Sequence, residues 1–116
     1  MSSDDVARRA ALRLGDELDR QLPAMVEAQL QGGGEPPERY EPATAIALAA
    51  LILSAAKFAW DIYRDLMKDS KTLPTAEVIA RRTRLELNKI QEVESSHLDR
   101  VITVVVDEVM RQPPAA

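Results

Sequence analysis

The residues of this chain that could do chemistry gather around its single histidine, His97. Glu94 and His97 have the Glu-x-x-His spacing of carboxylate di-iron bundles, which need two such pairs and two further inward-facing glutamates. One histidine per chain supplies that set only through a symmetric dimer. Ser95 and Ser96 precede His97, but neighbouring side chains on a helix point apart, which argues against a nucleophile–base pair. The favoured interpretation is a helix N-terminus with a solvated histidine, so we predict no catalytic residue, no metal and no cofactor.

Two further segments contain residue types that bind phosphate. The glycine triplet of residues 31–42, QGGGEPPERYEP, lacks the Lys-Ser/Thr pair of a phosphate-binding loop and is acidic, so we interpret it as a linker. Residues 78–93 have apolar residues near helix-turn-helix positions, and Arg81, Arg82 and Arg84 could contact DNA phosphates. Arg84 stands where the tight turn of that motif usually has glycine, and nearby glutamates would repel a polyanion. A small DNA-binding regulator is therefore an alternative hypothesis, and nucleic acid is a disfavoured partner.

The composition indicates one globular helical domain. The chain has 116 residues, 46% hydrophobic and only 3% aromatic, and Ala and Leu fill much of the apolar quota, which favours closely packed helices. The absence of Cys excludes disulfides and thiolate chemistry and is typical of a reducing cytoplasm. A net charge of −4 gives no general attraction to nucleic acid or anionic lipid. The N-terminal residues do not form a secretory signal, so we expect a cytoplasmic protein, and the frequent Arg, Ala and Pro indicate a bacterial one.

Residues 2–30 are predicted to form the first helix. Ser2 and Asp5 have the spacing of a capping box, and apolar residues follow at intervals of three or four. Pro23 interrupts this pattern and has no amide hydrogen to donate, so a kink or a break is expected near it. The kink is the favoured outcome, and two shorter helices are the alternative.

Two more helices are predicted near the C-terminus. Residues 75–90 begin with Thr75 as a plausible N-cap, and residues 96–111 begin with Ser96 at a capping-box position and end before two prolines. The run VITVVV in the last of these helices has high β-propensity. Its apolar residues nevertheless follow helical spacing. A helix is therefore favoured, and a strand over residues 101–106 is the alternative.

Residues 43–68 are predicted to be the central helix of the bundle. From Pro42 to Ala56 the chain carries no charge, but these fifteen residues are fewer than the roughly 20 that a spanning helix needs. Charged residues then share one narrow arc, and the rest of the surface holds one row of large and one row of small apolar residues. A helix with two such rows contacts at least two neighbours. A soluble core helix is favoured, and a helix that inserts into a membrane when the bundle opens is a further alternative.

The first turns of this central helix are apolar on every side, which predicts an interface. A bundle of this size has few elements to cover such a helix, and exposed apolar surface normally marks a contact. Small residues would let a second copy approach closely, so a homodimer is expected. An aromatic pair beside the charged arc could anchor a partner or cap the edge of the core. The candidate interface residues are Ala45, Ile46, Ala49, Ile52, Leu53, Trp60 and Tyr63.

Three segments, ALAALILSAAKFAWDIYRDLMKD, PTAEVIARRTRLEL and VITVVVDEVM, are similar to small helical domains from conflict and defence gene clusters of actinobacteria. The resemblance covers about residues 43–110 and implies a non-catalytic, effector-associated or adaptor module that brings proteins together. It carries over no catalytic residue. We therefore predict a single all-α domain, a four-helix bundle, whose function is to self-associate or to bridge a protein partner in a bacterial defence or signalling system.

Overall fold

The computed structural model describes residues 2–32, 43–68, 75–89 and 95–111, without the side chains of 43–45 and 95–96. The described residues form five α-helices and contain no strand. The all-α class is thus confirmed, but the four-helix count is corrected, because residues 2–30 form two helices. The elements are α1 (Ser3–Glu17), α2 (Leu22–Leu30), α3 (Ala43–Lys68), α4 (Ala76–Asn88) and α5 (Ser95–Met110).

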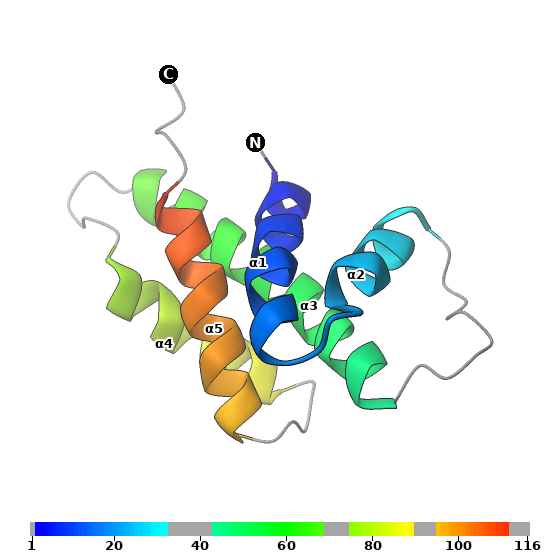
Figure 1. The fold of residues 1–116 in the computed structure, drawn as a ribbon. Coiled ribbons are helices and arrows are strands. Elements are labelled where there is room, and N and C mark those ends of the chain that lie inside the picture. Colours follow the sequence, from blue (N-terminus) through cyan, green and yellow to red (C-terminus); the bar gives the residue numbers. More distant parts are fainter. Residues whose placement is uncertain (1, 33–42, 69–74, 90–94, 112–116) are drawn as a thin grey trace.

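The longest helix, α3, contacts all four others and runs diagonally behind them (Figure 1). α1 and α5 lie side by side across it. α2 packs against α1 and the first half of α3, whereas α4 packs against α5 and the second half (Figure 1). The prediction of a central helix over residues 43–68 is confirmed, and its bounds agree with the structure.

Both apolar rows of α3 face the core. Leu51 and Ala55 from the row of large residues have no exposed surface, and neither do Ala56 and Ala59 from the row of small residues. Removing these side chains from water is the main force that holds α3 among its neighbours. The small row needs little space, so the helices that cover it approach α3 closely.

The break between α1 and α2 comes before the predicted position at Pro23. α1 ends at Glu17, and Asp19 organises the turn that follows. Its carboxylate accepts a hydrogen bond from the amide of Gln21 at 2.8 Å, and its carbonyl accepts one from the amide of Leu22 at 3.1 Å. Pro23 lies in the first turn of α2, where a missing amide hydrogen costs little and the fixed φ suits a helix. The proline therefore begins a helix and does not kink one.

Residues 101–106 are helical, so the strand alternative is wrong. Val101, Val104 and Val105 have no exposed surface, because α5 packs against α1, α3 and α4. The β-propensity of such residues amounts to about 1 kcal/mol at most and depends on the surroundings. The burial of these side chains against three neighbouring helices outweighs this preference for a strand.

Two predicted N-caps are confirmed. The carboxylate of Asp5 accepts a hydrogen bond from the amide of Ser2 at 3.2 Å, which starts α1. Thr75 Oγ1 accepts one from the amide of Val78 at 3.3 Å, which starts α4. The cap predicted at Ser96 lies outside the described side chains, and α5 begins at Ser95.

Candidate functional site

The predicted chemistry around His97 falls largely outside the described part of the chain. Glu94 and the side chains of Ser95 and Ser96 are not described, and the same holds for residues 33–42 of the glycine-rich segment. His97 is partly buried in the first turn of α5. Over the described ranges, no group of three or more His, Asp or Glu side chains could hold a metal ion. The absence of a catalytic centre stays a prediction.

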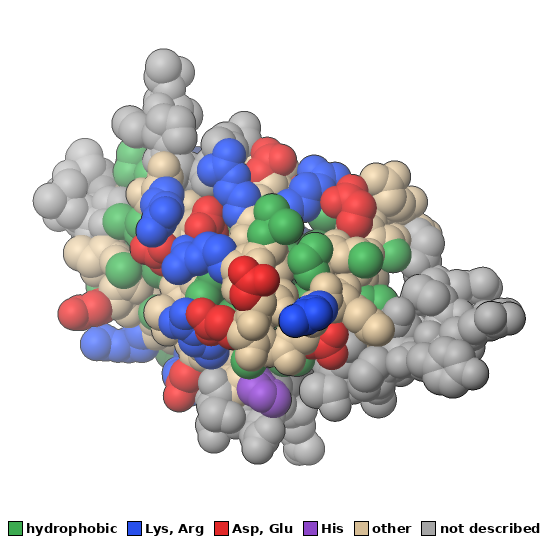
Figure 2. All heavy atoms as spheres, viewed as in Figure 1, with side chains coloured by type: hydrophobic (Ala, Val, Ile, Leu, Met, Phe, Trp, Pro, Cys, Tyr) green, Lys and Arg blue, Asp and Glu red, His purple; other side chains and the backbone are tan. Residues whose placement is uncertain are grey.

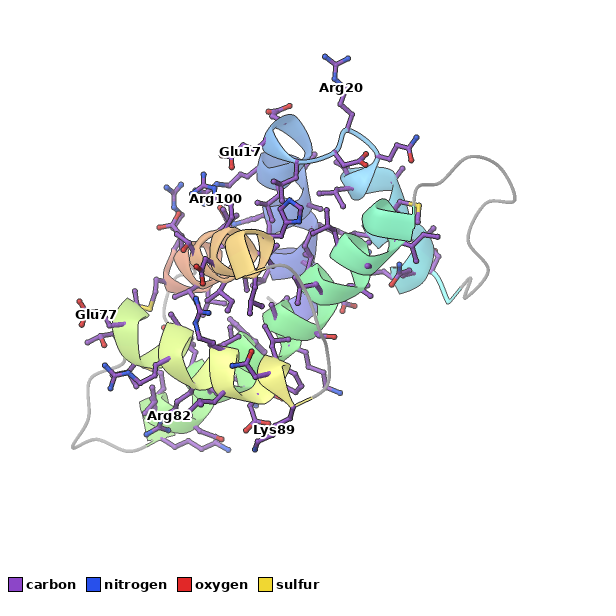
Figure 3. The ribbon with its side chains drawn as sticks, turned by 90° about the horizontal axis from the view of Figure 1, so that it is seen from below. Glu17, Arg20, Glu77, Arg82, Lys89 and Arg100 are labelled. Carbon is purple, nitrogen blue, oxygen red and sulfur yellow. The ribbon has the colours of Figure 1, made fainter. Side chains whose placement is uncertain are left out.

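The three arginines of the DNA-binding alternative do not share one free surface. Arg84 forms an ion pair with Asp99 of α5, whereas Arg81 and Arg82 are exposed on α4. Arg82 lies beside residues of α3 in the groove between the two helices (Figure 3). The helix continues unbroken through Arg84, where a helix-turn-helix motif needs its turn. Leu85, which that motif would bury, is 58% exposed. The local geometry on which this alternative depends is therefore not formed.

The candidate interface residues divide according to burial. Ala49 and Ile52 have no exposed surface, because other helices of the same chain cover them. They belong to the core, and a charge placed at Ala49 would be buried inside the fold instead of between two copies. The side chain of Ala45 lies outside the described residues. The remaining candidates are partly exposed: Ile46, Leu53, Trp60 and Tyr63.

Three of these partly exposed residues lie on one line along α3. Ile46, Leu53 and Trp60 are seven positions apart, so they fall on nearly the same side of the helix. Two residues between them and one beyond Trp60 complete steps of four and three, which is the heptad spacing of helices that pair, and none of the six is buried. We call this set the α3 stripe: Ile46, Ala50, Leu53, Lys57, Trp60 and Arg64. The spacing of these residues is visible in the sequence, but the other apolar residues of the same helix made this row hard to distinguish.

The aromatic pair holds one end of the α3 stripe in place. The rings of Trp60 and Tyr63 are stacked, with centroids 5.9 Å apart and an interplanar angle of 26°. Both side chains pack against the core and keep some exposure. The pair therefore caps the edge of the core, which was one of the two predicted interpretations. It also leaves Trp60 partly exposed on the stripe, and an aromatic side chain with only two rotatable bonds loses little conformational entropy on contact.

Ion pairs join α1 to its two neighbours. Arg8 donates to both carboxylate oxygens of Glu27 on α2, at 2.8 and 3.1 Å. Arg100 of α5 makes the same two-pronged contact with Glu17 of α1 (Figure 3). These hydrogen bonds and the arginine charge lower the pKa of Glu17 and of Glu27 below the ordinary value of 4.5. Figure 2 shows acidic and basic side chains interspersed over this face.

A second arginine cluster joins α1 to the last turns of α5. Arg13 Nη1 donates to Asp107 Oδ2 at 2.6 Å and to Glu108 Oε2 at 2.8 Å. Glu108 is 5% exposed, so the ion pair compensates a charge that burial would otherwise make costly. The hydrogen bond from Arg13 lowers the pKa of Asp107. Together the arginine contacts of α1 hold helices in register, which is a structural role.

α3 has one further property that bears on function. Its segment Ile46–Lys68 is long and apolar enough to cross a membrane, judged by length and composition alone. The core helix of a globular bundle meets the same criterion. Membrane insertion and a cytoplasmic location both stay predictions.

Comparisons with protein-family models, with curated proteins and with solved structures each gave no significant match. The fold and the surfaces described above are therefore the basis for a functional assignment. The resemblance to defence-cluster adaptor modules stays a prediction from the three quoted segments.

Proposed function

We propose that this chain is a non-enzymatic interaction domain that forms a homodimer through the α3 stripe. The observation that supports this function is a row at heptad spacing, apolar at every seventh position, that the other helices leave partly exposed. Ile46, Leu53 and Trp60 form its apolar edge.

An antiparallel pairing of two α3 stripes brings together side chains of complementary size. In the register that places Ala50 opposite Trp60 of the second copy, a small side chain faces a large one. The same register places Lys57 over Leu53 and Arg64 over Ile46. Lys and Arg cover apolar side chains with their aliphatic stems and keep their charges in water. A two-fold contact of this kind uses the same surface on both copies and closes at two chains.

Sedimentation or light scattering over a range of concentrations tests the dimer. We expect the wild-type chain to associate into a species of twice its 12.8 kDa mass. Leu53→Lys should give a folded monomer, because it places a second positive charge opposite Lys57 of the other copy, at the middle of the contact. Leu12→Lys is the matched control, since Leu12 is 62% exposed on α1 and lies outside the stripe.

Thermal melts establish that both variants remain folded. The Leu12→Lys protein should dimerise as the wild type does. A wild-type chain that stays monomeric at millimolar concentration contradicts the proposal, and so does a dimer that survives Leu53→Lys.

The proposed cellular role is that of an adaptor in the cytoplasm of a bacterium, in a defence or signalling system. A dimer presents every remaining surface twice, which raises the apparent affinity for a multivalent partner.

The two alternative functions, DNA binding and membrane insertion, have less support. The pairing of Arg84 with Asp99 removes one cation from the DNA-binding set. Most residues of both apolar rows of α3 are buried, so membrane insertion would first have to open the core.

A further inference from the structure

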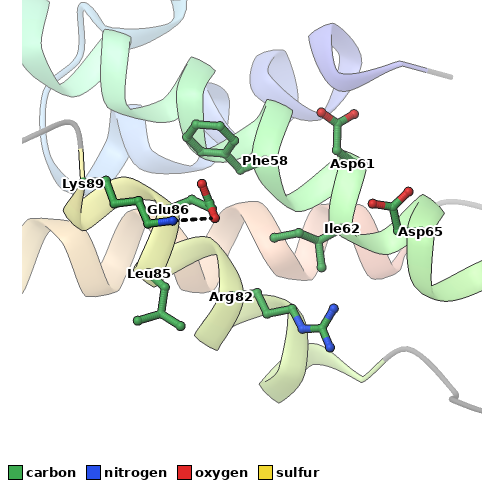
Figure 4. Close-up of a pocket in the computed structure, with 8 residues that line it drawn as sticks. All are labelled: Phe58, Asp61, Ile62, Asp65, Arg82, Leu85, Glu86 and Lys89. Atoms are coloured by element: carbon green, nitrogen blue, oxygen red, sulfur yellow. Dashed lines mark hydrogen bonds and ion pairs between the residues drawn. The ribbon is translucent and has the colours of Figure 1, made fainter.

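A groove of about 470 Å³ lies between α3 and α4 and shares no residue with the α3 stripe. Figure 4 shows that α3 supplies one wall and α4 the other. We call it the α3–α4 groove, and its lining residues are Phe58, Asp61, Ile62, Asp65, Arg82, Leu85, Glu86 and Lys89.

The groove has an apolar strip that the fold does not finish covering. Phe58 and Ile62 of α3 are only partly buried, and Leu85 of α4 is 58% exposed. All three side chains line the same groove, Phe58 and Ile62 from α3 and Leu85 from α4. Apolar surface that is contiguous and rimmed by polar residues is typical of a contact site.

Some of the charged side chains around this strip form ion pairs and others do not. Asp61 and Asp65 are exposed one turn apart on α3, and neither makes a hydrogen bond or ion pair within the described part of the chain. Two like charges at this spacing repel each other. On α4, by contrast, Glu86 pairs with Lys89 at 3.3 Å (Figure 4). The α3 wall therefore presents two carboxylates that form no ion pair beside the apolar strip. Arg82 of α4 lines the same groove without an ion pair among the described residues, so the unpaired charges of the groove are two negative and one positive.

The dimensions of the groove suit a helix. From Phe58 to Asp65 the α3 wall extends about 10 Å, at 1.5 Å per residue. That length matches two turns of a docked helix with apolar anchors at positions i, i+4 and i+7. A small ligand would need most of its surface enclosed, whereas Leu85 and both aspartates stand open to solvent.

We propose that the α3–α4 groove binds an amphipathic helix of a partner protein that carries basic residues along one edge of its apolar row. The apolar row packs on Phe58, Ile62 and Leu85. Lysines or arginines of the partner face Asp61 and Asp65 and relieve the repulsion between these two carboxylates. This site goes beyond the proposed dimer, because it takes a different chain on a different surface.

Two synthetic peptides of about 15 residues provide the test. Both carry the same leucine row at i, i+4 and i+7, and they differ in having lysine or glutamate at the flanking positions. Each is titrated into the isotopically labelled full chain and followed by NMR. We expect the lysine peptide to bind with chemical-shift changes centred on Phe58, Ile62 and Leu85. The glutamate peptide should bind roughly tenfold more weakly or not at all.

Charge reversal of the groove supplies the sharper measurement. Asp61→Lys combined with Asp65→Lys should weaken the lysine peptide by about tenfold and strengthen the glutamate peptide. Leu85→Ser should weaken both peptides by about tenfold. Leu12→Ser, the same change at the exposed leucine of α1, is the matched control and should leave both affinities unchanged. All four positions are exposed, and thermal melts verify that each variant is folded.

Three outcomes would overturn the proposal. They are equal affinity for the two peptides, no binding of the lysine peptide at millimolar concentration, and shift changes that map to the α3 stripe. Repeating the titration with Leu53→Lys separates this site from the dimer. Binding should persist in that variant, whether or not the wild-type chain dimerises.

Discussion

At the scale of single residues, Thr83 is the clearest departure from a well-satisfied core. It lies on the buried face of α4 with no exposed surface, and its hydroxyl has no hydrogen-bond partner among the described residues. A buried hydroxyl without a partner costs about 1–3 kcal/mol. We therefore expect Thr83→Val, which keeps the shape and removes the hydroxyl, to raise the free energy of unfolding by about 1 kcal/mol.

Urea denaturation measures this gain, and Thr103→Val is the matched control. Thr103 is exposed on α5, and its hydroxyl donates to the carbonyl of Asp99 at 2.8 Å. The control should change the free energy of unfolding by less than about 0.5 kcal/mol. A loss of stability in Thr83→Val would mean that the hydroxyl finds a partner in solution.

At the scale of elements, the corner between α1 and α2 depends on one close approach. A Cβ added at Gly15 would lie 3.1 Å from Cδ and 3.2 Å from Cγ of Pro23. Gly15 is buried, so a larger side chain has no solvent to move into. We expect Gly15→Val to lower the free energy of unfolding by about 2 kcal/mol, because it forces the first turn of α2 away from α1.

A double-mutant cycle with Pro23→Ala tests the cause of that loss. Pro23→Ala removes the two ring carbons that the new side chain would meet, so the double variant should recover part of the stability that Gly15→Val loses. Strict additivity of the two changes in a urea melt would show that the contact between Gly15 and Pro23 is not the cause.

At the scale of the whole molecule, the arginine contacts of α1 make stability depend on pH. The pKa values of Glu17, Glu27 and Asp107 are lowered in the folded chain by hydrogen bonds from arginines. Carboxylates with a lowered folded pKa contribute stability that is complete above their unfolded pKa and is lost as pH falls through the folded value. We expect the thermal midpoint to hold from pH 7 to about 5 and to fall progressively below about 4.5.

Circular dichroism melts across this range measure the effect. Glu17→Gln removes the pairing with Arg100, so it should lower the midpoint at neutral pH and make the acid decline shallower. Asp16→Asn alters an exposed carboxylate on the same helix that forms no ion pair within the described residues. This control should follow the wild-type pH dependence. Equal acid slopes for Glu17→Gln and the wild type would show that this pair does not govern the decline.

The sequence by itself determined where the helices of this chain run from residue 43 onward. The uncharged run, the two apolar rows and the charged arc predicted α3 with its observed bounds, and Thr75 was recognisable as the cap of α4. These are local properties, because 3.6 residues per turn and the hydrogen-bonding capacity of a cap are set within a few residues. The same spacing identified the valine-rich residues 101–106 as helical against their β-propensity.

Only the tertiary structure decided which side of each helix is covered. The first turns of α3 are apolar all round, so periodicity did not separate Ala49 and Ile52, which are buried, from Ile46 and Leu53, which stay partly exposed. The α3–α4 groove combines side chains from two helices that no local pattern relates. Spacing along the chain defines the faces of a helix, but burial depends on which other faces come to lie against them.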